Sequence, residues 1–168
     1  MGCVIREATV EDCEQIMSLI QEIAAYHHLE HDVTINSEVL KADGFGANSF
    51  FKCLLAEQPA ENGNKPGRPI GYALYYFGYS VNHGRMLYLE NLYVVPELRS
   101  KGIGMKLMKK VAEVALAAGC KEIKFVTVEW NQGAKDFYDR MGAHDTTESM
   151  QWHCMELGWD SLQRLAGN

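Results

Sequence analysis

The chain has 168 residues, of which 47% are hydrophobic and 23% are charged, and its formal net charge is −6. This length and composition predict one globular domain over residues 1–168, and the negative charge disfavours a nucleic-acid partner because its field repels phosphates and attracts cations. The sequence has no apolar run of 18 residues and no hydrophobic N-terminal segment of signal-peptide length, so we expect a cytoplasmic protein without membrane association.

The first part of the chain predicts a short strand and two helices. Residues 3–8 favour a strand, after which Thr9 and Asp12 have the spacing of a capping box at the start of a helix. Apolar residues then recur at three- and four-residue spacing as far as Ala24, which is typical of a helix with one buried face. A second, shorter helix is expected over residues 37–42, because two closely spaced glycines follow it.

The middle of the chain predicts β-structure that is interrupted by one loop. Residues 50–57 favour a strand, and residues 59–69 are rich in proline, glycine and asparagine, which predicts a flexible loop. The aromatic-rich segments 70–80 and 85–95 are separated by turn-forming residues at 82–84. We therefore expect these two segments to pair as an antiparallel hairpin.

The last part predicts helices between strands. Residues 102–118 have the apolar spacing of a helix, which leads by a parallel crossover to a strand over residues 121–128. A helix over residues 132–141, a strand over residues 152–157 and a short C-terminal helix complete the chain. This order predicts an α+β fold around a mixed sheet.

A basic turn with two glycines stands at the start of the helix predicted over residues 102–118. Its sequence is Arg99-Ser100-Lys101-Gly102-Ile103-Gly104. The first amides of a helix lack partners within the helix and lie at its positive end, so they bind phosphate where no side chain blocks the approach. Glycine in a helix costs about 0.5–1 kcal/mol relative to alanine, so two glycines here favour a pyrophosphate site over the alternative of a purely structural turn.

Several motifs, taken together, resemble the GNAT acetyltransferases. They are Leu92-Tyr93-Val94-Val95-Pro96, Arg99-x-x-Gly102-x-Gly104, Glu129-Trp130-Asn131 and Phe137-Tyr138-x-x-x-Gly142-Ala143. A second set is similar to the diamine (spermidine/spermine) acetyltransferases: Asp43-Gly44-Phe45-Gly46, Gly71-Tyr72-Ala73-Leu74-Tyr75-Tyr76-Phe77 and Tyr88-Leu89-Glu90-Asn91. The resemblance covers the whole chain. It implies a single GNAT domain with a mixed, mostly antiparallel twisted sheet flanked by helices, and a homodimer.

The resemblance also implies an activity and a cosubstrate. The expected reaction moves an acetyl group from acetyl-CoA to the primary amine of a small cationic acceptor, by direct attack in a ternary complex. In the family, the turn binds the CoA pyrophosphate, while strand amides hold the pantetheine arm and polarise the thioester carbonyl. The implied acetyl-CoA residues are Leu92, Tyr93, Val94, Arg99, Ser100, Lys101, Gly102, Ile103, Gly104, Met105, Asn131, Gln132, Gly133, Ala134 and Tyr138.

Acetyl transfer to an amine requires proton transfers. At pH 7 only about one primary alkylammonium in 2,500 carries a free lone pair, so a base is needed. Glu90 is the candidate, because it interrupts an apolar strand where a carboxylate is costly unless it is used; a glutamate that merely reaches solvent is the alternative. The resemblance implies that Glu90 acts through water and that Tyr138 protonates the departing thiolate. The alternative for Tyr138 is core packing beside Ala134 and Met141.

The acceptor site departs from that of the diamine enzymes. The resemblance implies acceptor contacts from Tyr26, His27, Glu90, Lys124, Phe125, Val126 and Met150. The diamine enzymes carry acids where His27 and Met150 stand, which disfavours efficient use of polyamines. Because Glu30, Asp32 and Glu148 are potential substitutes, a diamine, a polyamine and a lysine-like amine such as thialysine all stay open. A GNAT enzyme that acetylates protein lysines or N-termini is the alternative function.

We expect no metal cofactor. The five cysteines are scattered and contain no CxxC pair, so they predict neither a zinc site nor a disulfide framework. The histidines at positions 27, 28 and 31 lack a second ligand group at a known spacing, so a solvated turn is expected there.

Overall fold

The computed structural model describes residues 2–59 and 67–167, which separate into two units, Met1–Val126 and Thr127–Asn168. The loop predicted over residues 59–69 falls mostly outside the described residues. The expectation of one domain over the whole chain stays a prediction, and each unit is described here by itself.

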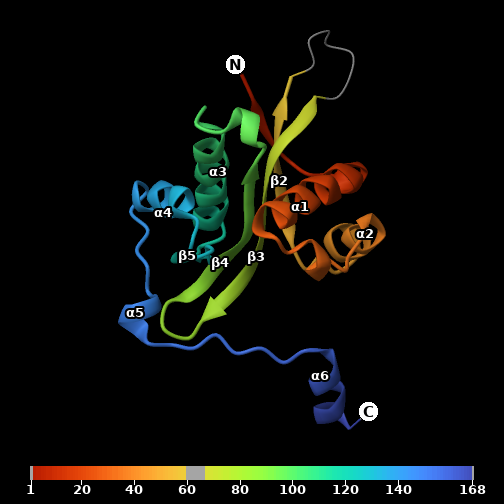
Figure 1. Cartoon of the computed structure of the whole chain (residues 1–168), viewed down its shortest axis with the longest axis vertical. Helices are drawn as coiled ribbons and strands as arrows, with labels where there is room; N and C mark the ends of the chain where they lie inside the picture. Colours follow the sequence, from red (N-terminus) through yellow and green to blue (C-terminus); the bar gives the residue numbers. More distant parts are fainter. Residues whose placement is uncertain (1, 60–66, 168) are drawn as a thin grey trace. The chain divides into compact units, whose positions relative to one another are not determined.

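A mixed sheet organises the first unit (Figure 1). Its strands are β1 (Val4–Glu7), β2 (Lys52–Gln58), β3 (Arg68–Ser80), β4 (Gly84–Val94) and β5 (Glu122–Lys124), in that spatial order. The first four pair antiparallel and β5 pairs parallel with β4, which confirms the predicted sheet and hairpin. The strand predicted over residues 121–128 forms only at its start, because its pairing with β4 ends at Lys124.

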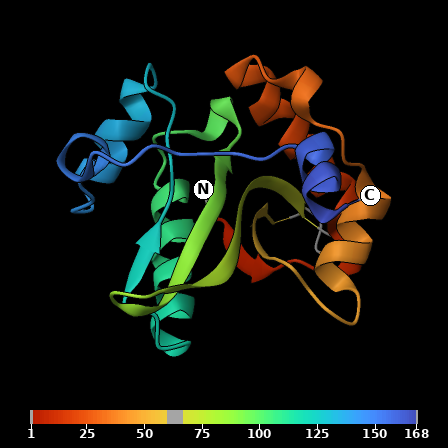
Figure 2. The ribbon, with the colours of Figure 1, turned by 90° about the horizontal axis from the view of Figure 1, so that it is seen from below.

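Helices cover both faces of this sheet. α1 (Cys13–His27) and α2 (Ser37–Phe45) lie on one face, and α3 (Ile103–Ala117) lies on the other (Figures 1 and 2). Short 3-10 turns are η1 (Val10–Asp12), η2 (Glu30–Asp32) and η3 (Pro96–Leu98). The helical spacing seen in the sequence corresponds to buried residues: Cys13, Ile16, Met17, Leu19, Ile20, Ile23 and Ala24 on α1, and Ile103, Leu107, Met108, Val111 and Ala115 on α3.

The helix predicted over residues 37–42 continues further than expected, to Phe45. Its cap is the Asn36 side chain, which accepts a hydrogen bond from the Val39 amide at 3.0 Å. Gly44 lies within the helix and does not end it. It is buried, and a β-carbon at this position would overlap the Phe51 ring. Here the packing against the aromatic ring, rather than chain flexibility, explains the glycine.

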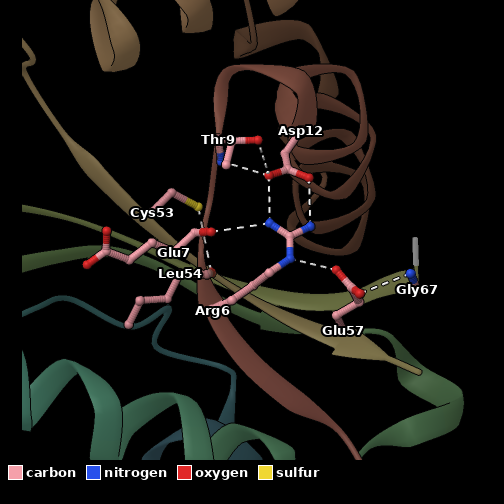
Figure 3. Close-up of polar contacts among 8 residues, drawn as sticks. All are labelled: Arg6, Glu7, Thr9, Asp12, Cys53, Leu54, Glu57 and Gly67. Carbon is pink, nitrogen blue, oxygen red and sulfur yellow. Dashed lines mark hydrogen bonds and ion pairs between the residues drawn. The ribbon is translucent and has the colours of Figure 1, made fainter. Parts of the chain in front are cut away.

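An ion network joins the start of the chain to the sheet (Figure 3). The Arg6 guanidinium donates to both carboxylate oxygens of Asp12 at 2.8 Å, and its Nε donates to Glu57 Oε2 at 2.6 Å. Asp12 also accepts from the Thr9 amide at 2.7 Å, and Glu57 accepts from the Gly67 amide at 2.9 Å. The network therefore links β1, η1, β2 and the start of β3.

Replacing Arg6 tests the contribution of this network to stability. Arg6→Met should lower the free energy of unfolding by about 2 kcal/mol, because the almost fully buried Asp12 carboxylate loses its cation. The exposed pair between Lys110 and Glu113 supplies the control, since Lys110→Met should cost at most about 0.5 kcal/mol in urea denaturation.

The same variant should differ from wild type in its pH dependence. The hydrogen bond from Arg6 lowers the pKa of Asp12. A depressed carboxylate pKa stabilises the fold above the unfolded pKa, about 4, and this stabilisation is lost as pH falls through the folded pKa. The difference between wild type and Arg6→Met should therefore shrink below about pH 4. An equal difference at pH 3 and pH 7 would contradict this account.

The second unit contains α4 (Gln132–Asp139), α5 (Thr147–Met150) and α6 (Trp159–Ala166). The predicted helix over residues 132–141 and the C-terminal helix are confirmed, although α4 ends two residues earlier. The strand predicted over residues 152–157 is wrong: none is assigned there. A strand needs a neighbour that pairs with its main chain, and the last strand in the described part of the chain is β5. None of the helices described has the length and apolar character needed to cross a membrane.

Candidate active site

The turn between β4 and α3 has the geometry expected of an anion site. Gly102 has a φ of +79°, and a β-carbon there would meet no atom within 4 Å, so glycine is required by the backbone conformation rather than by space. The first amide bonded within the helix belongs to Lys106, which donates to the Gly102 carbonyl at 3.1 Å. The amides of Ile103, Gly104 and Met105 precede that bond and so point out of the helix start.

The basic side chains of the turn are held by its own backbone. Lys101 Nζ donates to the Glu97 carbonyl at 3.1 Å, and Arg99 Nε donates to the Val94 carbonyl at 2.9 Å. Ser100, which is exposed, has a φ of +60°. Cationic groups therefore flank the amides at the start of α3, which is a suitable arrangement for a pyrophosphate.

Arg99 also lies between two aromatic rings. Its Cζ is 4.8 Å from the centre of the Tyr26 ring and 5.5 Å from that of Tyr93. The Tyr93 hydroxyl donates to Glu22 Oε2 at 3.0 Å. Burial, and then the nearby Arg99 charge, lower the pKa of His27. The structure thus brings the end of α1, where acceptor residues were expected, to the cosubstrate turn.

Glu90 lies in a β-bulge that the sequence analysis did not predict. On β3, Leu74 and Tyr75 are adjacent, but their partners on β4 are Asn91 and Leu89, so Glu90 is an additional residue. Its side chain is exposed. The strand therefore carries a carboxylate without burying it, and a base at this position remains accessible to a substrate.

The edge of β4 that lies opposite β3 is only partly covered. β5 pairs with residues Met86, Leu87 and Tyr88, and in the described part of the chain no strand lies beside β4 beyond them. The segment Leu92, Tyr93 and Val94, expected to hold pantetheine, belongs to this uncovered stretch. Main-chain groups on an uncovered edge are available to a ligand, except here the Val94 carbonyl, which accepts from Arg99.

The second unit holds the remaining candidates for cosubstrate binding. Asn131 caps α4 by accepting a hydrogen bond from the Ala134 amide at 3.1 Å, and Gln132 and Gly133 lie in the same first turn. Tyr138 lies in the last turn of α4, where burial raises its pKa to about 12. Tyr138 is therefore protonated at neutral pH, as a proton donor must be.

The expected acceptor residues come from several elements. They are Tyr26 and His27 at the end of α1, Glu90 in the bulge, Lys124 at the end of β5, Phe125 and Val126 directly after it, and Met150 at the end of α5. Of these, the structure brings Tyr26 and His27 close to Arg99. Within the described residues no group of histidine, cysteine and acidic side chains could hold a metal ion.

The sequence analysis did not identify Glu22 as a partner of Tyr93, nor Tyr72 as a buried polar residue near the site strand. Glu22 is on an exposed part of α1 and is identified only by its bond to Tyr93. Tyr72 lies in an apolar strand, where a tyrosine is usually read as core, and only the structure shows that its buried hydroxyl has no hydrogen bond among the described residues.

Comparisons with known proteins place this geometry in a family. Residues 14–143 match the profile of the acetyltransferase (GNAT) family. The chain is 47% identical over 165 residues to thialysine N-epsilon-acetyltransferase of Bos taurus. The aligned residues cover 98% of this chain and 97% of that protein. It is 33% identical over 162 residues to spermidine/spermine N(1)-acetyltransferase-like protein 1 of Homo sapiens, covering 96% of this chain and 23% of that protein.

A solved structure supports the fold. The integron cassette protein from the mobile metagenome of V. cholerae aligns with a TM-score of 0.75 and 22% identity, covering 100% of this chain and 99% of that one. At this identity the likeness concerns the fold alone, and it agrees with the predicted mixed sheet flanked by helices. With the family match and the near full-length similarity, the chain belongs to the GNAT acetyltransferases and is an acetyltransferase.

Proposed function

We propose that this enzyme transfers an acetyl group from acetyl-CoA to the side-chain amine of a lysine-like acceptor such as thialysine. The observation that carries the proposal is the 47% identity, along almost the entire chain, to a protein named for that acceptor. The similarity to the spermidine/spermine-like protein is lower, at 33% identity. This order favours a lysine-like amine over a polyamine.

The charge at the end of α1 agrees with that preference. A polyamine has further ammonium groups that need anionic partners, whereas the second ammonium of a lysine-like acceptor, on its α-carbon, is balanced by the adjacent carboxylate. His27, whose pKa lies below its ordinary value, is neutral at pH 7 and supplies no negative charge. The adjacent Arg99 guanidinium repels a second ammonium.

The proposed placement of acetyl-CoA follows from the features of the turn and the strand edge. The pyrophosphate would lie on the amides of Ile103, Gly104 and Met105, with Arg99 and Lys101 as flanking cations. The pantetheine arm would follow the β4 edge at residues 92–94. A role in cosubstrate binding for residues 131–134 is proposed on the resemblance to the family alone.

The proposed chemistry uses one base and one acid. Glu90 accepts the proton of the acceptor ammonium through water, and the neutral amine attacks the thioester carbonyl. When the tetrahedral intermediate collapses, its C–S bond breaks and Tyr138 gives its proton to the departing CoA thiolate. The attacking nitrogen loses its second proton to solvent, and solvent reprotonates Tyr138. We also propose a homodimer, on the resemblance to the diamine enzymes alone, and sedimentation equilibrium tests it. The cytoplasmic location is proposed on the sequence analysis.

An amine panel tests the function directly. With acetyl-CoA in excess, kcat/KM is measured for thialysine, lysine, ornithine, spermidine, a short monoamine and lysine-containing peptides, by following release of the CoA thiol. The expected result is the highest kcat/KM for thialysine. A preference for peptides would favour the protein acetyltransferase alternative instead, and a strong preference for spermidine would overturn the choice of acceptor.

Met150 provides a second test of acceptor selectivity. Met150→Glu should raise kcat/KM for spermidine relative to a monoamine about fivefold, because a partly screened ion pair is worth about 1 kcal/mol. The gain should shrink at higher ionic strength. Met155→Glu introduces the same charge five residues later and should leave the ratio unchanged. If the two variants behave alike, Met150 does not contact the acceptor.

A further inference from the structure

Arg99 is held in place by contacts that come from different parts of the first unit. Its Nε donates to the Val94 carbonyl at 2.9 Å. Its Cζ is 4.8 Å from the centre of the Tyr26 ring and 5.5 Å from the centre of the Tyr93 ring. A free arginine side chain adopts many rotamers, and binding a ligand removes that freedom. Here the end of α1 and strand β4 both restrict the side chain.

The Tyr93 ring is itself fixed by α1. Tyr93 is only 5% exposed, and its hydroxyl donates to Glu22 Oε2 at 3.0 Å. Burial, followed by the hydrogen bond with Glu22, raises the pKa of Tyr93 to about 12, so the hydroxyl remains a donor at neutral pH. Glu22 precedes Tyr26 by about one helical turn, so the two side chains project from the same face of α1. That face therefore contacts both Arg99 and the ring that holds it.

The restricted guanidinium is suited to a phosphate. The bond to Val94 uses Nε, and the terminal Nη groups of Arg99 lie at the other end of the planar fork, where an arginine donates in parallel to two phosphate oxygens. Lys101, another cation of the turn, is exposed and donates to the Glu97 carbonyl within the turn itself. Arg99 differs from Lys101 because residues outside the turn, on α1 and β4, hold it.

We propose that Tyr93 and Glu22 are positioning residues for Arg99: Glu22 fixes the Tyr93 ring, and that ring holds the guanidinium where it binds the CoA pyrophosphate. The inference rests on the proposed placement of acetyl-CoA, since it needs Arg99 to contact the pyrophosphate. Because the fold already restricts Arg99, less conformational entropy is lost on binding, which raises the affinity for acetyl-CoA. The Tyr93 side chain thus has a role separate from the one proposed for its main chain.

A comparison of two acetyl donors separates this role from a structural one. S-acetylpantetheine carries the thioester and the pantetheine arm of acetyl-CoA but lacks the pyrophosphate. The readout is the ratio of kcat/KM for acetyl-CoA to kcat/KM for S-acetylpantetheine, with thialysine at a fixed concentration. Tyr93→Phe keeps the ring and removes the hydroxyl, so it should lower this ratio about threefold. Tyr93→Leu also removes the ring and should lower the ratio about tenfold.

Glu22 should show the same dependence on the donor. Glu22→Ala should lower the ratio about threefold, and Glu22→Gln, which keeps an oxygen that accepts from the Tyr93 hydroxyl, should restore it. Glu14→Ala is the matched control, because Glu14 lies about two turns earlier on α1 and accepts from the Ser37 hydroxyl at 2.7 Å, which joins α1 to α2. Its ratio should equal that of wild type. A ratio as low in Glu22→Gln as in Glu22→Ala would contradict the proposal.

A double variant identifies the residue through which Tyr93 acts. In an Arg99→Gln background, adding Tyr93→Phe should leave the ratio unchanged, because no guanidinium is left to hold. A further threefold loss in that background would show that Tyr93 acts without Arg99, and the inference would be wrong.

Calorimetric titration with CoA gives a readout that does not depend on the acceptor. The dissociation constant should rise about threefold in Tyr93→Phe and in Glu22→Ala, with urea denaturation establishing that both are folded. A wild type that binds CoA and pantetheine equally well overturns the placement of the pyrophosphate and this inference with it. A wild type that binds CoA more tightly, with variants that weaken both ligands equally, overturns this inference alone. The amine panel tests the choice of acceptor separately.

Discussion

Glu90→Gln should lower kcat/KM for thialysine about a hundredfold at pH 7, since general base catalysis typically contributes about 10²–10⁴. Glutamine has the same shape but cannot take the ammonium proton. The deficit relative to wild type should be largest at low pH and should shrink as the free amine fraction grows towards the amine pKa of about 10.4. The measurement is kcat/KM between about pH 5.5 and 10.

Two variants serve as references for Glu90→Gln. Glu113→Gln removes an exposed carboxylate from α3 and should leave the profile unchanged. Tyr138→Phe removes the acid rather than the base, so it should lower kcat without the added deficit at low pH, and CoA affinity should change little. A wild-type profile in Glu90→Gln would show that the bulge glutamate is not the base.

Gly102→Val should weaken acetyl-CoA binding about a hundredfold, because Gly102 has a φ of +79°, a conformation that a β-branched residue avoids. The backbone has to change, and the amides of Ile103, Gly104 and Met105 then lose their common direction. Calorimetric titration of the variant with CoA measures the effect.

Gly119 offers a matched control for Gly102, because it lies just beyond the other end of α3 with a φ of +74°. Gly119→Val imposes a similar strain away from the turn, so it should cost stability without weakening CoA binding. Urea denaturation of both variants establishes that each is folded during the titration. Equal CoA affinity in the two variants would contradict the proposal that the turn binds the pyrophosphate.

The elements that the sequence predicted correctly have local signals. The hairpin formed by β3 and β4 was indicated by two aromatic-rich segments around a turn, and α3 was indicated by apolar spacing alone. The strand expected over residues 152–157 does not form. Strand pairing depends on a neighbour elsewhere in the chain, which the local pattern of apolar and polar residues cannot specify. β5 is short for the same reason.

The features of the candidate site also differ in whether a local sequence signal predicts them. Gly102 and Gly104 are separated by one residue in the sequence, and the predicted turn does not depend on distant residues. In contrast, the contacts of Arg99 with Tyr26 and Tyr93 join residues from α1, the turn and β4. No spacing in the sequence predicts these contacts. The bulge at Glu90 was also missed, since an additional residue becomes visible only when the partner strand is known.

The bulge changes the phase of β4. Before it, Leu87 and Leu89 pair with Phe77 and Tyr75, and after it Tyr93 pairs with Tyr72. Odd-numbered residues of one strand thus share a face with odd-numbered residues of β3 on one side of Glu90 and with even-numbered residues on the other.

On each side of the bulge, successive side chains of β4 still point to opposite faces of the sheet. Deleting residue 90 would remove the bulge together with the carboxylate: Leu89 and Asn91 would become neighbours opposite Tyr75 and Leu74, and Tyr93 would stay opposite Tyr72. The strand pairing therefore accommodates either length at this point, and what residue 90 adds is an exposed side chain and the local bend and twist of a bulge.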